Sequence, residues 1–378
     1  MKRKFISILL VLVLVLSFSL VTAAPAAAYS YDNYTDAITK TADRLVDLQD
    51  TTDGGWDGDV TGLTTHSDQP SGVNLFGVTA LGLIDAYEVT GEMAYKTAAQ
   101  LTADHLLTVD REANSTDRIY SFDYRFLVEF SALSGDGSYA AHAIYQWNWV
   151  KTNAPFFYED ENQEQYYQWC LDIAQVSPGY ATWSIGDVGL AALAMGDTSW
   201  ASNMAAVLAD HLPDITGDDD WRFIGWGKAL ELLNAVDSVG YSTEITSLIS
   251  NLTGSQTNGY WPGAADQGRV QNTAYAVMGL AAVGEGGNAQ AGADWLVENQ
   301  ISSGDSTGGW LDPDDENKEY SYVDSEALQA LVAVAALTKA NILKDSGVPG
   351  KGLDTAPGQG KAFNSKSQAG QHAGKKDK

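Results

Sequence analysis

Apolar and polar positions alternate between two kinds of helical segment along most of the chain. In one kind, apolar residues follow one side of a helix and leave a polar side, as in residues 34–49, 92–107, 199–212 and 288–300. In the other, apolar residues lie all round and Ala and Gly are frequent, as in residues 74–87, 184–196, 271–284 and 324–337. A helix that is apolar all round is buried, and a helix with one apolar stripe covers it. The pattern therefore predicts an inner and an outer layer of helices.

Pairing the segments in order gives about six helical hairpins. They are residues 33–49 with 72–89, 92–108 with 120–134, 138–175 with 180–196, 197–212 with 221–237, 241–253 with 268–284, and 287–300 with 320–343. The third pair carries an insertion and a second outer helix. Repeats of this length are typical of helical repeat proteins, so an open solenoid is one alternative. We favour a closed, all-α (α/α)6 toroid because the end repeats are as apolar as the middle ones and lack a polar capping face.

The two ends of the chain differ from this pattern. Residues 1–28 combine a Lys/Arg start, an apolar run and a small-residue cleavage site, which is typical of a signal peptide. A retained membrane anchor is the alternative, because the apolar run is barely long enough to span a bilayer. Residues 346–378 are rich in Gly, Lys, Ser and Gln and should be a disordered basic tail. We therefore expect a secreted or cell-surface protein whose toroid domain covers residues 29–345 and which has no membrane span once the signal is removed.

Charge and cysteine content narrow the possible functions. The chain has 22 basic and 49 acidic residues; nine of the basic and two of the acidic ones lie in the end segments, which leaves 13 against 47. Such a surface repels nucleic acid, so we exclude nucleic-acid binding. Cys170 is the one cysteine, so no disulfide can form within the chain and the core must hold by burial alone. We expect a monomer with no cofactor.

A recurring Gln–Gly–Trp pattern follows three of the outer segments. Leu48–Trp56, Ser255–Trp261 and Asn299–Trp310 each place a Gln at a helix end, then a polar turn with Gly, then a Trp. Degraded forms occur at Gly217–Gly227 and Ser177–Trp183. Physically, the Gln amide can donate to free helix-end carbonyls, the Gly permits a left-handed turn, and the Trp buries a large area. We expect Gln49, Trp56, Gln256, Trp261, Gln300 and Trp310 to staple one hairpin to the next.

This pattern resembles the QW repeat of the terpenoid cyclase and protein prenyltransferase superfamily, whose fold is an α/α toroid. The resemblance covers most of residues 33–343, and it is more specific for fold than for function. The superfamily's catalytic motifs do not carry over. The D-x-D-D of Asp312–Asp315 is followed by Glu316 rather than Thr-Ala, and Cys170 lacks the zinc-ligand context. Asp312, Asp314 and Glu316 could bind Ca²⁺, although a solvated acidic loop is the default interpretation. We predict no metal site.

The starts of the inner helices are the most promising place for chemistry. In a closed ring these ends surround a central cavity, and carboxylates, aromatic rings and Arg meet there. Paired carboxylates can perform acid–base work, and aromatic faces can stack on sugars. The candidate catalytic residues are Asp123, Asp187, Asp324 and Glu326. The candidate binding residues are Tyr120, Arg125, Trp183, Trp221, Arg222, Trp226, Lys228, Arg269, Asn272, Tyr320 and Tyr322.

Several functions remain open at this stage. Lys228 and Glu326 occupy equivalent positions in their repeats, and a buried Lys–Glu network competes with a functional site as their explanation. The first hypothesis is a secreted protein that binds or cleaves an extracellular glycan or other polymer in the cavity. The second is a non-catalytic surface or interaction scaffold. The third is a terpenoid cyclase-like isomerase of the squalene or hopene type. A wide open cleft with paired acids would favour the first hypothesis, a filled ring centre would favour the second, and a cavity lined by aromatic rings with one buried Asp would favour the third.

Overall fold

The computed structural model describes residues 29–67, 69–114, 117–153, 164–172, 176–263, 269–313 and 317–345. Within these ranges it contains thirteen α-helices and one 3-10 turn, Leu212–Asp214, and no strand longer than an isolated bridge. The expected signal segment and basic tail lie outside the described residues, as do Asp314, Asp315 and Glu316. None of the helices in the described ranges is long and apolar enough to cross a membrane.

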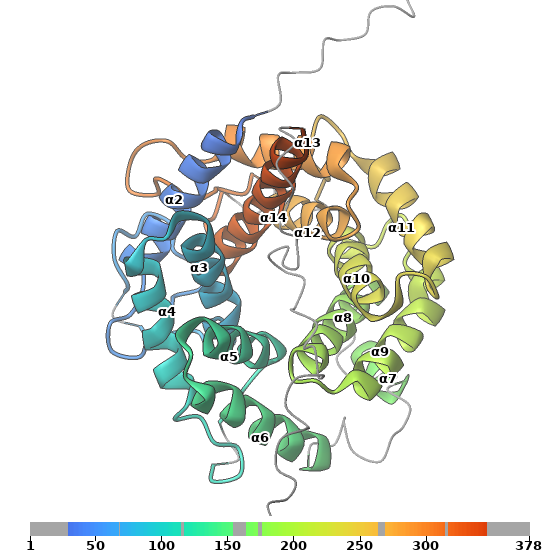
Figure 1. Cartoon of the computed structure of the whole chain (residues 1–378), viewed down its shortest axis with the longest axis horizontal. Coiled ribbons are helices and arrows are strands. Elements are labelled where there is room, and N and C mark those ends of the chain that lie inside the picture. The colour runs from blue at the N-terminus through green and yellow to red at the C-terminus, as the bar shows by residue number, and fades with distance from the viewer. Residues whose placement is uncertain are drawn as a thin grey trace, which may run out of the picture.

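Six inner helices form a closed ring (Figure 1). They are α3 (Phe76–Thr90), α5 (Ser121–Ser134), α8 (Pro178–Ala194), α10 (Arg222–Asp237), α12 (Arg269–Ala282) and α14 (Ser321–Asp345). Each contacts the next in chain order, and α14 contacts α3, so the circle has no free end. The outer helices are α2 (Tyr31–Asp47), α4 (Met93–Leu106), α6 (Gly137–Asn153), α7 (Glu164–Asp172), α9 (Thr198–His211), α11 (Ser242–Ser255) and α13 (Gly286–Asn299). The predicted (α/α)6 toroid is confirmed, including the two outer helices of the third hairpin.

Burial follows the two kinds of helix that the sequence distinguishes. Along α12 every residue from Asn272 to Ala281 is buried, because neighbouring helices cover all of its sides. In α11, by contrast, the buried residues are Ile245, Leu248 and Leu252, a single stripe three to four positions apart. The apolar interior is therefore shared between the two layers and does not depend on a disulfide, since the one cysteine is free and buried.

The Gln–Gly–Trp segments staple neighbouring hairpins as predicted. The side-chain amide of Gln300, just after α13, donates to the carbonyl oxygen of Ala37 in α2 at 2.9 Å, and the indole N–H of Trp310 donates to the carbonyl of Leu296 at 2.8 Å. Gly308 in this turn has φ of 94°, and a Cβ there would lie 2.3 Å from the carbonyl oxygen of Lys40. Only glycine fits such a position. Gln49 and Gln256 make corresponding bonds to α4 and α13.

The junction between the last and first hairpins is also held by buried polar contacts. The Arg44 guanidinium pairs with the Glu319 carboxylate, with Nε and Oε1 2.9 Å apart and both side chains buried. The Ser321 hydroxyl donates to the carbonyl of Asp57 at 2.6 Å, and the Ser325 hydroxyl donates to the carbonyl of α3 residue Val78 at 2.9 Å. Residues more than 240 positions apart in sequence thus complete the ring.

Candidate functional site

A cavity of about 500 Å³ opens where the inner helices begin. Every inner helix, or the loop that leads into it, contributes to its wall, which confirms that the helix starts surround a cavity. Its lining residues are Gly58, Gly72, Asn74, Leu75, Val78, Phe122, Tyr180, Trp183, Trp221, Gln271, Trp310, Asp312, Lys318, Tyr320, Tyr322, Val323 and Glu326. We refer to it as the aromatic cavity. Its volume lies in the range of roughly 300–1,000 Å³ that is typical of small-molecule sites.

Two groups of aromatic rings dominate this wall. Tyr180, Trp183 and Trp221 form one cluster: the ring centroids of Tyr180 and Trp221 are 4.6 Å apart, and those of Trp183 and Trp221 are 5.7 Å apart. On the side formed by α14 and its preceding loop, the rings of Tyr320 and Tyr322 have centroids 5.5 Å apart. Four of these five residues are binding residues predicted from the sequence. Large, rigid ring faces are suited to the apolar C–H faces of sugar rings.

Glu326 of α14 places a carboxyl group in the wall of the aromatic cavity. Its oxygens accept hydrogen bonds from the Tyr275 hydroxyl at 2.7 Å and from the Gln271 amide at 2.9 Å, and the side chain is only 2% exposed. The indole N–H of Trp183 in turn donates to the Tyr275 hydroxyl at 3.0 Å. Burial raises the pKa of Glu326 to about 7, against the hydrogen bonds and the Lys228 charge that lower it. Glu326 is therefore a candidate proton donor near neutral pH.

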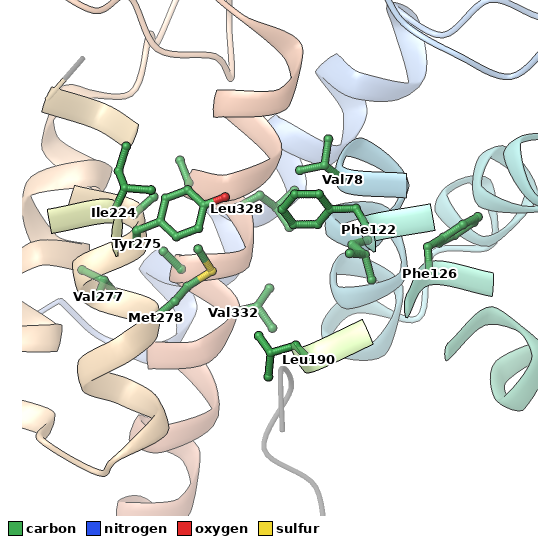
Figure 2. Packing of buried hydrophobic residues seen from close by; sticks show 14 of the residues in the cluster. Val78, Phe122, Phe126, Leu190, Ile224, Tyr275, Val277, Met278, Leu328 and Val332 are labelled. Atoms are coloured by element: carbon green, nitrogen blue, oxygen red, sulfur yellow. The ribbon is translucent and has the colours of Figure 1, made fainter. Parts of the chain in front are cut away.

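Side chains pack together at the ring centre. Figure 2 shows Tyr275 of α12 and Phe122 of α5 pointing toward each other from opposite sides of the ring. The Lys228 Nζ lies 5.0 Å from the Tyr275 ring centroid and 5.8 Å from that of Phe122. It is paired with the Glu231 carboxylate at 2.7 Å. The predicted buried Lys–Glu interaction exists, but Glu231, one turn along α10, provides the carboxylate instead of Glu326. The toroid thus combines an open cavity with a packed centre.

Asp187 of α8 lies close to this cluster without lining the aromatic cavity. One of its carboxylate oxygens accepts a hydrogen bond from the Ser121 hydroxyl, and the other, Oδ1, is buried with no hydrogen-bond partner among the described residues. Burial raises the pKa of Asp187, while the positive charges of Lys228 and Arg125 oppose that shift. Its position between α5 and α10 makes it an electrostatic neighbour of Glu326.

The other two predicted catalytic residues accept hydrogen bonds from backbone N–H groups near the starts of inner helices. The Asp123 carboxylate accepts from its own helix start, Tyr120 N at 2.7 Å, and from Gly77 N of α3 at 2.8 Å. Asp324 accepts from the backbone N–H of Trp310 at 3.0 Å. Burial raises the pKa of Asp123 to about 7 and that of Asp324 well above its usual range. Neither residue is among the residues that line the aromatic cavity, and both carboxylates accept hydrogen bonds from backbone N–H groups.

The remaining predicted binding residues fall into two groups. Tyr120 lines a second cavity, described below. The others line neither the aromatic cavity nor this second cavity. They are Arg125, paired with Glu129; Arg222, over the Phe223 ring; Trp226, packed against Phe223; Arg269, over Tyr260; Asn272, bonded to the Pro262 carbonyl; and Lys228, paired with Glu231. Conversely, Phe122, Trp310, Asp312 and Lys318 line the aromatic cavity but were not predicted as binding residues.

The structure defines a closed (α/α)6 toroid with an aromatic cavity and a carboxyl group in its wall. No protein-family model matches the sequence, and no curated protein matches it. The fold is similar to that of the alpha-1,6-mannanase GH76A of Salegentibacter sp. HEL1_6, in an inactive variant in complex with alpha-1,6-mannotriose (TM-score 0.56, 13% identity, 80% of this chain and 99% of that chain).

Two further solved structures have a similar fold. One is a glycosyl hydrolase of family 88 from Bacteroides vulgatus (TM-score 0.54, 12% identity, 82% of this chain and 100% of that chain). The other is the unsaturated glucuronyl hydrolase from Streptococcus agalactiae (TM-score 0.52, 13% identity, 81% of this chain and 93% of that chain). At these identities the similarity establishes the fold.

These neighbours overturn the resemblance to the terpenoid cyclase and protein prenyltransferase superfamily. The similar solved structures are a mannanase, a family 88 hydrolase and a glucuronyl hydrolase, so assigning the chain to that superfamily was wrong. The physical reason lies in the motif itself. Its Trp satisfies a carbonyl at the end of one outer helix, its Gln donates to a carbonyl within the next outer helix, and its Gly allows that next helix to approach closely. The motif therefore indicates a ring of helical hairpins and does not indicate one particular superfamily.

Proposed function

We propose that this chain is a secreted or cell-surface protein that binds a glycan in the aromatic cavity and cleaves it, with Glu326 as the proton donor. The main supporting observation is that one cavity combines clustered aromatic rings with a buried carboxyl group whose pKa is about 7. The fold that the chain shares with a mannanase, a family 88 hydrolase and a glucuronyl hydrolase supports this choice. Each of those proteins is named for action on a sugar.

The chemistry follows from the groups in the cavity wall. Trp183, Trp221 and Tyr322 hold sugar rings by their faces and exclude water from the bond to be cleaved. Glu326, protonated in part near neutral pH, delivers a proton to the leaving oxygen of the glycosidic bond. Asp312 supplies a second carboxylate in the same wall, which can either attack the sugar carbon directly or activate a water molecule.

A glycan array probed with the purified full-length chain tests binding first. Trp221→Ala should weaken binding to the best array ligand by about tenfold or more, because a large stacking face is lost. Trp295→Ala is the matched control, since Trp295 lies on outer helix α13 and is not among the residues that line the cavity. Equal affinities of the parent and Trp221→Ala would refute the cavity as the binding site.

Turnover of the same ligand tests cleavage. Glu326→Gln should lower the rate by about a hundredfold or more while binding persists, because a general acid typically contributes that much. If the parent binds the glycan but releases no reducing sugar, the non-catalytic scaffold is the better description, and the packed ring centre is the observation that favours it.

A further inference from the structure

A second cavity of about 310 Å³ adjoins the aromatic cavity. The two share the lining residues Asn74, Phe122, Tyr180 and Trp183, so a ligand in one lies against the wall of the other. The remaining walls come from the segment between α4 and α5 and from α5, α6, α7 and α8. We refer to it as the side cavity, and its volume is at the lower end of the range for small-molecule sites.

Arg111 distinguishes the side cavity chemically. It is the only charged residue among the described residues that line this cavity, in a chain of net charge −27. Its Nε is buried and has no hydrogen-bond partner in the described part of the protein, while its guanidinium lies 5.5 Å from the Trp149 ring centroid. A buried N–H donor without an acceptor costs free energy, so this group is suited to receive an acceptor from a ligand.

Tyr124 presents a second donor without an acceptor in the same wall. The side chain is 3% exposed, and its hydroxyl has no hydrogen-bond partner among the described residues. The ring is fixed edge-on against Trp147, with centroids 5.5 Å apart, so the hydroxyl cannot turn away freely. Burial raises the pKa of Tyr124, and the nearby Arg111 charge opposes that shift, so the hydroxyl remains a protonated donor at neutral pH.

We propose that the side cavity is a subsite for a sugar unit that carries a negatively charged substituent, a carboxylate or a sulfate, held by Arg111 and Tyr124. The inference rests on the proposed function and specifies the substrate class of the same site. A guanidinium donates two parallel hydrogen bonds to such an anion, and a hydroxyl can add a third. An anionic sugar unit would form an ion pair with Arg111 and accept hydrogen bonds from two buried donors, Arg111 Nε and the Tyr124 hydroxyl.

Two sources of negative charge act against this binding and need to be weighed. Asp187 lies behind Ser121, which lines the side cavity, but Lys228 and Arg125 offset its charge. The remaining acidic surface of the chain acts over distances at which salt screens it, because the Debye length is about 8 Å at physiological ionic strength. A contact at hydrogen-bond distance inside the cavity is screened far less, so the local pairing decides the preference.

The test uses the full-length chain and matched oligosaccharides in three forms: uronate-containing, carboxyl-reduced to the neutral sugar, and sulfated. The parent should bind one anionic form about tenfold tighter than the neutral form, in line with a charged hydrogen bond. Arg111→Gln should abolish this preference, weakening the anionic form far more than the neutral form. Tyr124→Phe should reduce it severalfold with an unchanged or higher melting temperature, because no native hydrogen bond is lost. Arg118→Gln is the control, an exposed arginine in the same loop.

The outcomes separate this inference from the proposed function. If the parent binds neutral and anionic forms equally, or if Arg111→Gln weakens both to the same extent, the subsite assignment is overturned while glycan binding stands. If the parent binds none of the three forms and no array glycan, both proposals fail. A preference confined to the uronate or to the sulfated form identifies which anion the side cavity accepts.

Discussion

Glu326→Gln gives a direct test of the electrostatics at the cavity, independent of any ligand. The folded-state pKa of Glu326 is about 7, against an ordinary value of 4.5. The folded chain therefore binds more protons than the unfolded chain between these values, and stability falls as the pH rises through this window. A difference of about 2.5 units corresponds to a loss on the order of 3 kcal/mol above pH 7. Glutamine keeps the shape and cannot ionise, so this loss should disappear in the variant.

The measurement is the free energy of unfolding of both proteins by urea at pH 4.5 and pH 8, followed by tryptophan fluorescence. From pH 4.5 to pH 8, the free energy of unfolding of Glu326→Gln should rise relative to that of the parent by on the order of 3 kcal/mol. The control is Glu298→Gln on outer helix α13, which makes the same chemical change on an exposed side chain. Parallel pH profiles for the parent and Glu326→Gln would refute the assignment of a raised pKa to this buried carboxyl.

Three further predictions concern the closure of the ring and share thermal and urea unfolding as their assays. Gln300→Ala should lower the free energy of unfolding by about 1–3 kcal/mol, because the hydrogen bonds from its amide to the carbonyls of Ala37 and Gly308 are lost, whereas exposed Asn299→Ala should change little. Arg44→Met should lower the free energy of unfolding by about 3–5 kcal/mol, because it leaves the buried Glu319 carboxylate unpaired. Adding Glu319→Leu should restore most of this loss. A double variant whose loss equals the sum of the two single losses would contradict the pairing. Gly308→Ala should prevent a native fold, and a native melting temperature would disprove the packing argument.

The helical layers could be predicted because their cause is local in sequence. An apolar stripe, as at Ile245, Leu248 and Leu252, requires a partner on one side only, and the all-apolar segments require partners on every side. Closure of the ring followed from the absence of a polar end repeat. The staple at Trp310 was also predictable, because the free carbonyls at a helix end have few possible donors nearby. Gln300 joins the next hairpin as expected, but its amide donates to Ala37 in the middle of α2 and not to a helix end.

The site could be predicted only in part because side-chain direction depends on the rotation of each helix in the ring. The stretch from Phe122 to Tyr124 illustrates this. Phe122 lines both cavities, Tyr124 lines the side cavity, and Asp123 between them turns to the N–H of Gly77 in the neighbouring helix. All three looked similar as residues at a helix start. Lys228 is a different case. Its partner Glu231 lies three positions along the same helix, so this pair could have been predicted from the sequence.

The bond between Gln300 and Ala37 has a consequence for biosynthesis. The two residues are 263 positions apart, so the first outer helix is made long before Gln300, and α14, which also contacts that helix, is made later still. At about 5–20 residues per second, translation of the intervening chain takes roughly 13–53 s. During that time the apolar stripe of α2 and the flank of α3 that will meet α14 remain uncovered. The nascent chain therefore has to be kept from aggregating until its end is made, and a truncation before α14 would leave that flank permanently exposed.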